Sequence, residues 1–98
     1  MNREQIVATL RAHEPELKTA GIVRLSLFGS TVRGDCRPDS DVDLLAAFDE
    51  SRALSLLDVV HIENQLADLL GYRVDLIEEG ALGPRAQKAV EAEAMRAF

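Results

Sequence analysis

Two apolar runs constrain the fold of this chain most. The first stops at Gly29-Ser30, and the second begins around Asp41 and Asp43 after a gap of ten residues. The first run predicts a strand over residues 22–28 and the second a strand over about 43–48, joined by a tight turn and a short helix or loop. Alternate residues of a strand point to the same face. We therefore expect the Asp41 and Asp43 carboxylates to project together.

Carboxylates held this close repel each other unless a cation sits between them, and hard oxygen ligands suit Mg²⁺. Gly29 allows a ligand to approach the backbone closely, and Ser30 can cap a following helical turn whose free N–H groups would face a phosphate. The two halves of the motif together predict a site for the transfer of a phosphorus-containing group.

A calcium-binding loop is the alternative that we weigh against magnesium. Asp39, Asp41 and Asp43 alternate, and Glu50 occupies position twelve of such a loop. Position six requires glycine, however, and here it is Leu44. The sequence therefore favours magnesium.

A third acid, Asp75, lies inside a predicted strand over residues 72–77, where aspartate is normally disfavoured. Its strand neighbours Val74 and Leu76 are apolar. From the residues alone, a catalytic carboxylate and a solvated aspartate at a strand edge remain equally open.

The remaining pattern predicts helices around the three strands. They cover residues 3–12, a further turn through Leu17 and Lys18 that ends at Gly21, residues 54–70, and a last helix opened by Gly83-Pro84 that carries Val90, Met95 and Phe98 as its larger apolar groups. The helix over 54–70 has a broad apolar arc made of Leu56, Val59, Val60, Ile62, Leu66, Ala67, Leu69 and Leu70. Glu63 falls inside this arc, so we expect it to pair with an arginine or to reach a rim.

The predicted fold is a small α/β (α+β) sandwich, with a mixed sheet of about three strands flanked by helices. The first two strands are too close in the sequence for a purely parallel sheet, which needs long crossover connections. At 98 residues we expect one domain over residues 1–98.

Charge and composition narrow the class of partner. Seventeen acidic and eleven basic side chains give a net charge of −6, which argues against direct binding to a nucleic-acid backbone. Nucleotides remain open as ligands because Mg²⁺ can carry the opposing charge. A single cysteine, Cys36, a polar N-terminus and the lack of a long apolar run predict a soluble, cytoplasmic protein without membrane contact.

The string Phe28-Gly29-Ser30, Arg33-Gly34 and Ser40-Asp41-Val42-Asp43-Leu44 resembles the signature of the nucleotidyltransferase superfamily of the DNA polymerase β type. The fuller pattern is similar to that of its minimal nucleotidyltransferase (MNT) branch. Members of this branch are typically the antitoxin partners of HEPN-domain ribonuclease toxins. The resemblance covers nearly the whole chain.

The resemblance implies a role for each motif residue. Asp41 and Asp43 would bind two Mg²⁺ ions, and Asp75 would complete the shell of the catalytic ion and orient or deprotonate the attacking hydroxyl. Gly29 and Ser30 would hold the triphosphate of ATP, so that the α-phosphorus is attacked and pyrophosphate leaves.

Two arginines lie near the motif. Arg33 matches the family string, and it would either neutralise pyrophosphate or form a salt bridge to Asp35, Asp39 or Asp41. Arg37 is expected to be a solvated loop charge.

We carry three functions forward from the sequence. The first is a transfer of AMP from ATP to a hydroxyl, with a tyrosine of the cognate HEPN toxin as the acceptor that the resemblance implies. The second is an antitoxin that acts mainly by binding. The third is a small-molecule nucleotidyltransferase of the aminoglycoside-modifying kind, although those enzymes usually carry an additional helical domain. No base-reading residue is identifiable, so ATP comes from the resemblance.

Overall fold

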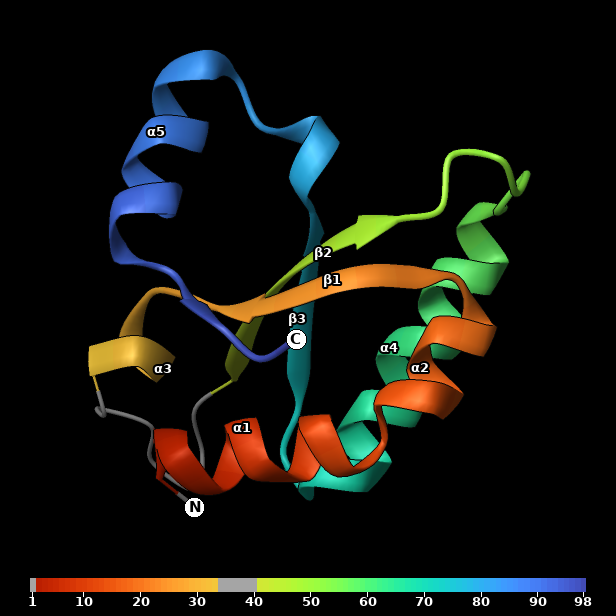
Figure 1. Ribbon diagram of the computed structural model, residues 1–98, viewed down its shortest axis with the longest axis horizontal. Helices are drawn as coiled ribbons and strands as arrows, with labels where there is room; N and C mark the ends of the chain where they lie inside the picture. Colours follow the sequence, from red (N-terminus) through yellow and green to blue (C-terminus); the bar gives the residue numbers. More distant parts are fainter. Residues whose placement is uncertain (1, 34–40) are drawn as a thin grey trace.

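The computed structural model describes residues 2–33 and 41–98, with the side chains of Ser30 and Arg33 outside the description. In chain order the elements are α1 (Arg3–Ala12), α2 (Glu14–Ala20), β1 (Ile22–Leu27), α3 (Ser30–Arg33), β2 (Val42–Phe48), α4 (Leu56–Leu70), β3 (Val74–Glu78), the 3₁₀ turn η1 (Glu79–Ala81), α5 (Pro84–Glu93) and β4 (Met95–Arg96) (Figure 1).

The sheet is mixed, as predicted, with strand order β3-β2-β1-β4. β1 runs antiparallel to β2 and to β4, whereas β2 and β3 are parallel. The short α3 connection between β1 and β2 explains the first antiparallel pair, because a parallel pair needs a longer crossover. The α4 helix supplies that crossover between β2 and β3.

The prediction of about three strands was wrong by one, and so was the extent of the last helix. α5 ends at Glu93, and Met95–Arg96 pairs with β1 as β4. Hydrogen bonds hold this end of the chain, since the Ala97 N–H donates to the Leu25 carbonyl at 2.8 Å and the Arg11 side chain donates to the Ala97 carbonyl at 2.7 Å. Pairing with a distant strand overrides the local helical pattern here.

The first helix and the longest helix have clear local causes. Asn2 and Gln5 form a reciprocal capping box at the start of α1, and Ser55 and Asp58 form another at the start of α4. α4 begins two residues later than predicted because Ser55 is its cap. It ends at Gly71, which has the left-handed φ of 74° that favours glycine.

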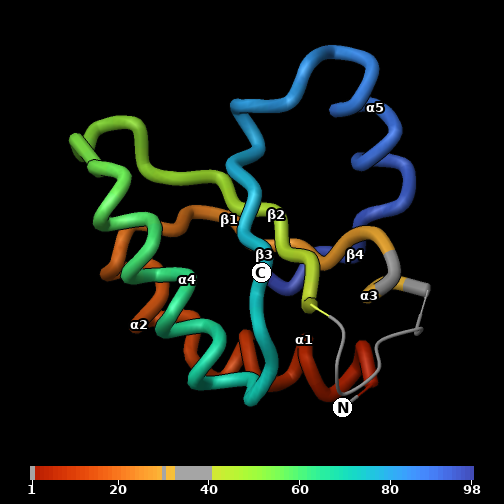
Figure 2. The backbone as a smooth tube through the Cα atoms, turned by 180° about the vertical axis from the view of Figure 1, so that it is seen from behind, coloured from red at the N-terminus to blue at the C-terminus, as the bar shows by residue number. Residues whose placement is uncertain are grey.

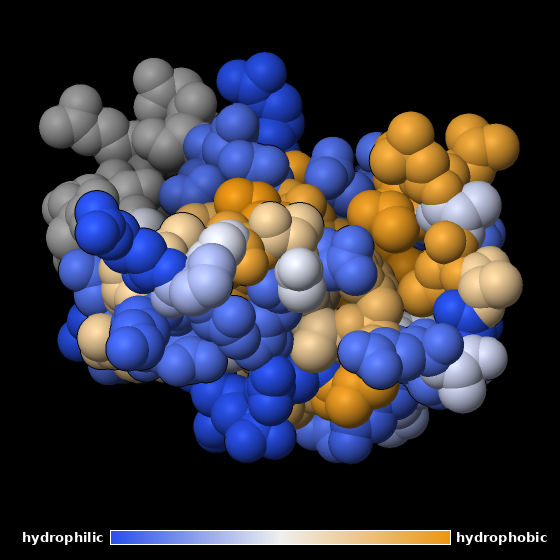
Figure 3. All heavy atoms as spheres, turned by 90° about the horizontal axis from the view of Figure 1, so that it is seen from above, coloured by the Kyte–Doolittle hydropathy of each residue, from blue (hydrophilic) through white to orange (hydrophobic). Residues whose placement is uncertain are grey.

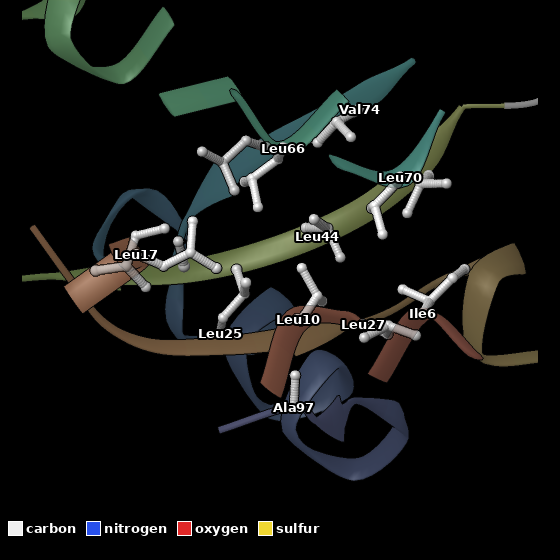
Figure 4. Packing of buried hydrophobic residues seen from close by; sticks show 14 of the residues in the cluster. Ile6, Leu10, Leu17, Leu25, Leu27, Leu44, Leu66, Leu70, Val74 and Ala97 are labelled. Carbon is white, nitrogen blue, oxygen red and sulfur yellow. The ribbon is translucent and has the colours of Figure 1, made fainter. Parts of the chain in front are cut away.

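Apolar side chains from α1, α2 and α4 pack against one face of the sheet (Figure 4). The fully buried members include Ile6, Leu10, Leu17, Leu25, Leu27, Leu44 and Leu66. α5 lies on the opposite side of the molecule from α4 in both backbone views (Figures 1 and 2). In the described part of the chain, no helix combines the length and apolar character needed to cross a bilayer.

The predicted apolar arc of α4 is broader than the face that is buried. Ile62, Leu66 and Leu70 are buried, but Leu56 is 79% exposed and Val60 is 44% exposed. Glu63, the acid inside the arc, lies beside the edge strand β3. Its Oε2 accepts the Leu76 N–H at 3.4 Å. The Glu63 carboxylate therefore accepts a hydrogen bond from a backbone N–H on the open edge of β3, rather than pairing with an arginine.

Candidate functional site

Asp43 and Asp75 are direct partners on the parallel strands β2 and β3. Side chains of residues paired in this way lie on the same face of a sheet. The residues that flank each aspartate are buried: Val42, Leu44, Val74 and Leu76. The two carboxylates therefore lie on the face away from the α1–α2–α4 core, Asp43 half-buried and Asp75 exposed.

The turn after β1 holds Asp43 closely. Gly29 has a φ of 64°, and a Cβ added there would lie 2.9 Å from Asp43 Oδ2. The absence of a side chain at Gly29 therefore leaves room for the Asp43 carboxylate. Hydrogen bonds to its backbone also hold Asp43, since the Phe28 N–H donates to the Asp43 carbonyl at 3.2 Å and the Asp43 N–H donates to Thr31 Oγ1 at 2.9 Å.

Asp41, the remaining predicted acid, forms an ion pair with Arg73. Arg73 Nε lies 3.3 Å from Asp41 Oδ1, with side chains 84% and 51% exposed respectively. Ion pairs this exposed contribute only about 0–1 kcal/mol. A bound cation can therefore compete for Asp41 at little cost.

Asp41 and Asp75 line a common cavity of about 380 Å³ between β3 and α4, together with Glu63, Asn64 and Arg73. Within the described residues, however, no three acidic, histidine or cysteine side chains are close enough to hold one metal ion. The structure therefore joins Asp43 to Asp75 by strand pairing and Asp41 to Asp75 through this cavity, without a closed three-acid cluster.

Two interactions at this site were not anticipated from the sequence. Thr31 is only 1% exposed, and its hydroxyl accepts the backbone N–H of Asp43. Arg3 Nη1 donates to the Val32 carbonyl at 2.8 Å, which ties α1 to α3. In the sequence, the position of the polar Thr31 directly after Gly29-Ser30 could have indicated a hydrogen bond at this turn, whereas nothing near Arg3 indicated its contact with α3.

Other predicted residues cannot be placed. Ser30 begins α3, but its side chain and that of Arg33 lie outside the description. Arg37 and Cys36 also lie outside the described residues.

Two acids outside the candidate site have a lowered pKa. Hydrogen bonds from Ser51 lower the pKa of Asp49, and the Ser55 backbone and hydroxyl lower the pKa of Asp58. At the candidate site, the carboxylate oxygens of Asp43 and Asp75 are ligands of the kind that Mg²⁺ prefers.

Comparisons with known proteins relate the chain to a family and to solved structures. The family model described as nucleotidyltransferase domain matches residues 10–96. The chain is similar to the protein adenylyltransferase MntA of Thermococcus cleftensis, with 42% identity over 88 residues that cover 89% of this chain and 87% of the relative. It also superposes on a solved structure described as a minimal nucleotidyltransferase with a TM-score of 0.81 and 42% identity, covering 97% of this chain and 95% of the other.

A more distant structure shares the fold alone. It contains a tri-AMPylated HEPN toxin of Shewanella oneidensis in complex with its MNT antitoxin, and it matches with a TM-score of 0.60 and 20% identity. That match covers 99% of this chain and 69% of the other chain.

Proposed function

This chain belongs to the nucleotidyltransferase-domain family, in its minimal branch, and from that premise we propose that it moves AMP from Mg²⁺-bound ATP to a tyrosine hydroxyl of a HEPN-domain toxin encoded beside it. In this proposal the modification silences the toxin, so that the chain acts as its antitoxin. The name of the Thermococcus relative supports protein adenylylation, and the Shewanella complex supports a HEPN partner.

The observation that carries the proposal is the pairing of Asp43 with Asp75 opposite the Gly29 turn. Asp43 and Asp75 would hold Mg²⁺, and Asp41 would join them on leaving Arg73. Gly29 and Ser30 would hold the triphosphate. When bound, Mg²⁺ would neutralise the negative charge on the α-phosphate that is transferred and on the pyrophosphate that leaves.

Asp75 lies on the edge strand β3, is exposed and lines the cavity that it shares with Asp41, so an acceptor can reach it from outside the sheet. It would orient the tyrosine hydroxyl and take its proton. The hydroxyl oxygen then forms a bond to the α-phosphorus as the bond to the β-phosphate oxygen breaks. AMP stays on the tyrosine and pyrophosphate leaves, so positioning and charge supply most of the catalysis.

The test is to incubate the chain with α-labelled ATP, Mg²⁺ and the HEPN protein of the adjacent gene, and to follow label and mass. We expect the HEPN protein to gain one or more AMP units, and the variants Asp43→Asn and Asp75→Asn to transfer none. Asp68→Asn, which removes an exposed acid of α4, is the matched control and should transfer normally.

Other outcomes would contradict the proposal. Full neutralisation of the toxin by an Asp41→Ala, Asp43→Ala double variant without transfer of label would make the chain an antitoxin that acts by binding. Label on an added aminoglycoside, with none on the HEPN protein, would make it a small-molecule nucleotidyltransferase.

A further inference from the structure

Three apolar side chains at the start of α4 face solvent. Leu56, Leu57 and Val60 are 79%, 80% and 44% exposed, and we call them the leucine ridge. Hydrophobic atoms gather in Figure 3 toward the end of the molecule where Figure 1 places the start of α4. Exposed apolar clusters of this kind mark interaction surfaces.

A hollow of about 280 Å³ lies beside the ridge. Its lining mixes the apolar residues Ala53, Leu54 and Ile62 with the polar residues Arg52, Asp58 and His61. Protein interfaces are anchored where apolar groups of one partner fill desolvated pockets of the other. The ridge and the hollow together offer both a projecting anchor and a pocket.

α4 leads directly from the ridge to the candidate site. Asn64 and Ala67, four and seven residues after Val60, line the cavity shared by Asp41 and Asp75. At a rise of about 1.5 Å per residue, these positions lie roughly 6–10 Å further along the helix axis. A protein bound on the ridge would therefore extend naturally to the cavity beside Asp75.

The charge around the ridge restricts the partner. Residues 49–60, which lead into the ridge and carry it, contain three acidic side chains and one basic one. The basic one is Arg52, whose guanidinium donates to the Thr19 carbonyl. A matching protein surface would present apolar side chains bordered by lysine or arginine.

We propose that the leucine ridge docks the acceptor protein through such an apolar, basic-rimmed surface, and that α4 brings the acceptor hydroxyl to the cavity beside Asp75. This inference rests on the proposed transfer of AMP to a protein. It adds the surface that recognises that protein.

The test variant is Leu57→Asp. Residue 57 is exposed and lies in the first turn of α4, where the helix dipole favours a carboxylate, so the variant should fold. The control is Ala89→Asp, which adds the same charge to an exposed position of α5 on the opposite side of the molecule.

Binding of the HEPN protein of the adjacent gene is measured by titration without ATP, and AMP transfer is measured separately. We expect Leu57→Asp to weaken binding at least tenfold and to raise the KM for the HEPN protein equally, with the KM for ATP unchanged. Ala89→Asp should match the unaltered chain in every measurement.

Unchanged binding by Leu57→Asp would overturn the docking proposal, as would a failure of the unaltered chain to bind the HEPN protein. Sedimentation that shows a dimer dissociated by Leu57→Asp would also overturn it, because the ridge would then bind a second copy. Binding that is lost in Leu57→Asp, without AMP transfer by the unaltered chain, would support docking while contradicting the proposed function.

Discussion

Gly29 is required by two separate constraints at one position. Its φ of 64° is a conformation that side chains with a Cβ rarely adopt, and the Asp43 carboxylate fills the place of the missing Cβ. Gly71 has a similar φ of 74° with no atom within 4 Å of an added Cβ. A comparison of alanine substitutions at Gly29 and Gly71 therefore distinguishes the effect of backbone strain from the effect of displacing the Asp43 carboxylate.

We predict that Gly29→Ala and Gly71→Ala each lower the free energy of unfolding by about 1–2 kcal/mol through left-handed strain. Only Gly29→Ala should reduce AMP transfer, by about a hundredfold, because the Asp43 carboxylate must shift. Urea unfolding and labelled-ATP kinetics measure the two effects. Equal transfer rates in both variants would show that the glycine does not position Asp43.

Thr31 gives a second prediction at this scale. Thr31→Val leaves the Asp43 N–H without its acceptor, which should cost about 1–3 kcal/mol of unfolding free energy and slow AMP transfer. Thr31→Ser keeps the hydroxyl and should retain most of the activity. If the valine variant were as stable and active as the unaltered chain, the hydrogen bond would have no positioning role.

Among the elements, α4 makes three kinds of contact. Its buried face packs into the core, Glu63 accepts a hydrogen bond from the edge strand β3, and its exposed first turns form the leucine ridge. Its start depends on the capping box of Ser55 and Asp58. Asp58 Oδ2 accepts from the Ser55 N–H at 2.9 Å and from the Ser55 hydroxyl at 3.1 Å.

The capping box predicts a dependence of stability on pH. The Ser55 hydrogen bonds lower the pKa of Asp58 in the folded chain, so their contribution is complete above the ordinary aspartate pKa and is lost as the pH falls through the lower folded pKa. We expect Asp58→Ala to melt below the unaltered chain at pH 7, with the gap closing in acid. A melting-temperature gap that is constant from pH 7 to pH 2 would contradict this assignment.

Local patterns predicted the elements whose causes are local. The helices over 3–12 and 54–70 follow from caps and apolar spacing, and their boundaries were nearly correct. β4 was missed because its two residues become a strand only through pairing with β1. Leu56 belongs to the predicted apolar arc of α4 but is exposed, because helical spacing does not show how much of an apolar face the neighbouring elements cover.

The same division holds for the candidate site. The sequence motif predicted that the Gly29 turn would face the Asp43 carboxylate, and the apolar strand neighbours of Asp75 marked it as a candidate. The ion pair of Asp41 with Arg73 could not be predicted, because it depends on how β3 is placed beside β2. The Thr31 hydrogen bond likewise depends on the packing of α3 against β2.

At the scale of the whole molecule, the proposed function requires an acidic chain to bind an anionic nucleotide, and a cation would offset the repulsion. The net charge is −6, and the candidate site brings the carboxylates of Asp43 and Asp75 to one face of the sheet. Mg²⁺ and ATP should therefore bind together, each weakly without the other.

We predict that Mg²⁺ with ATP raises the melting temperature of the chain, whereas ATP with EDTA does not. A ligand present at one hundred times its Kd stabilises the folded state by about 2.7 kcal/mol. Differential scanning fluorimetry at millimolar concentrations measures the shift. No shift with Mg²⁺-ATP would argue strongly against the site.

The central claim, that Asp43 and Asp75 hold the metal opposite the Gly29 turn, is tested most directly by crystals grown with Mn²⁺ and AMP-PNP. Anomalous scattering locates the Mn²⁺ ion independently of the nucleotide density. We predict a peak about 2 Å from carboxylate oxygens of both Asp43 and Asp75, the coordination distance of a hard divalent ion. A nucleotide bound with its metal away from both carboxylates would contradict the account.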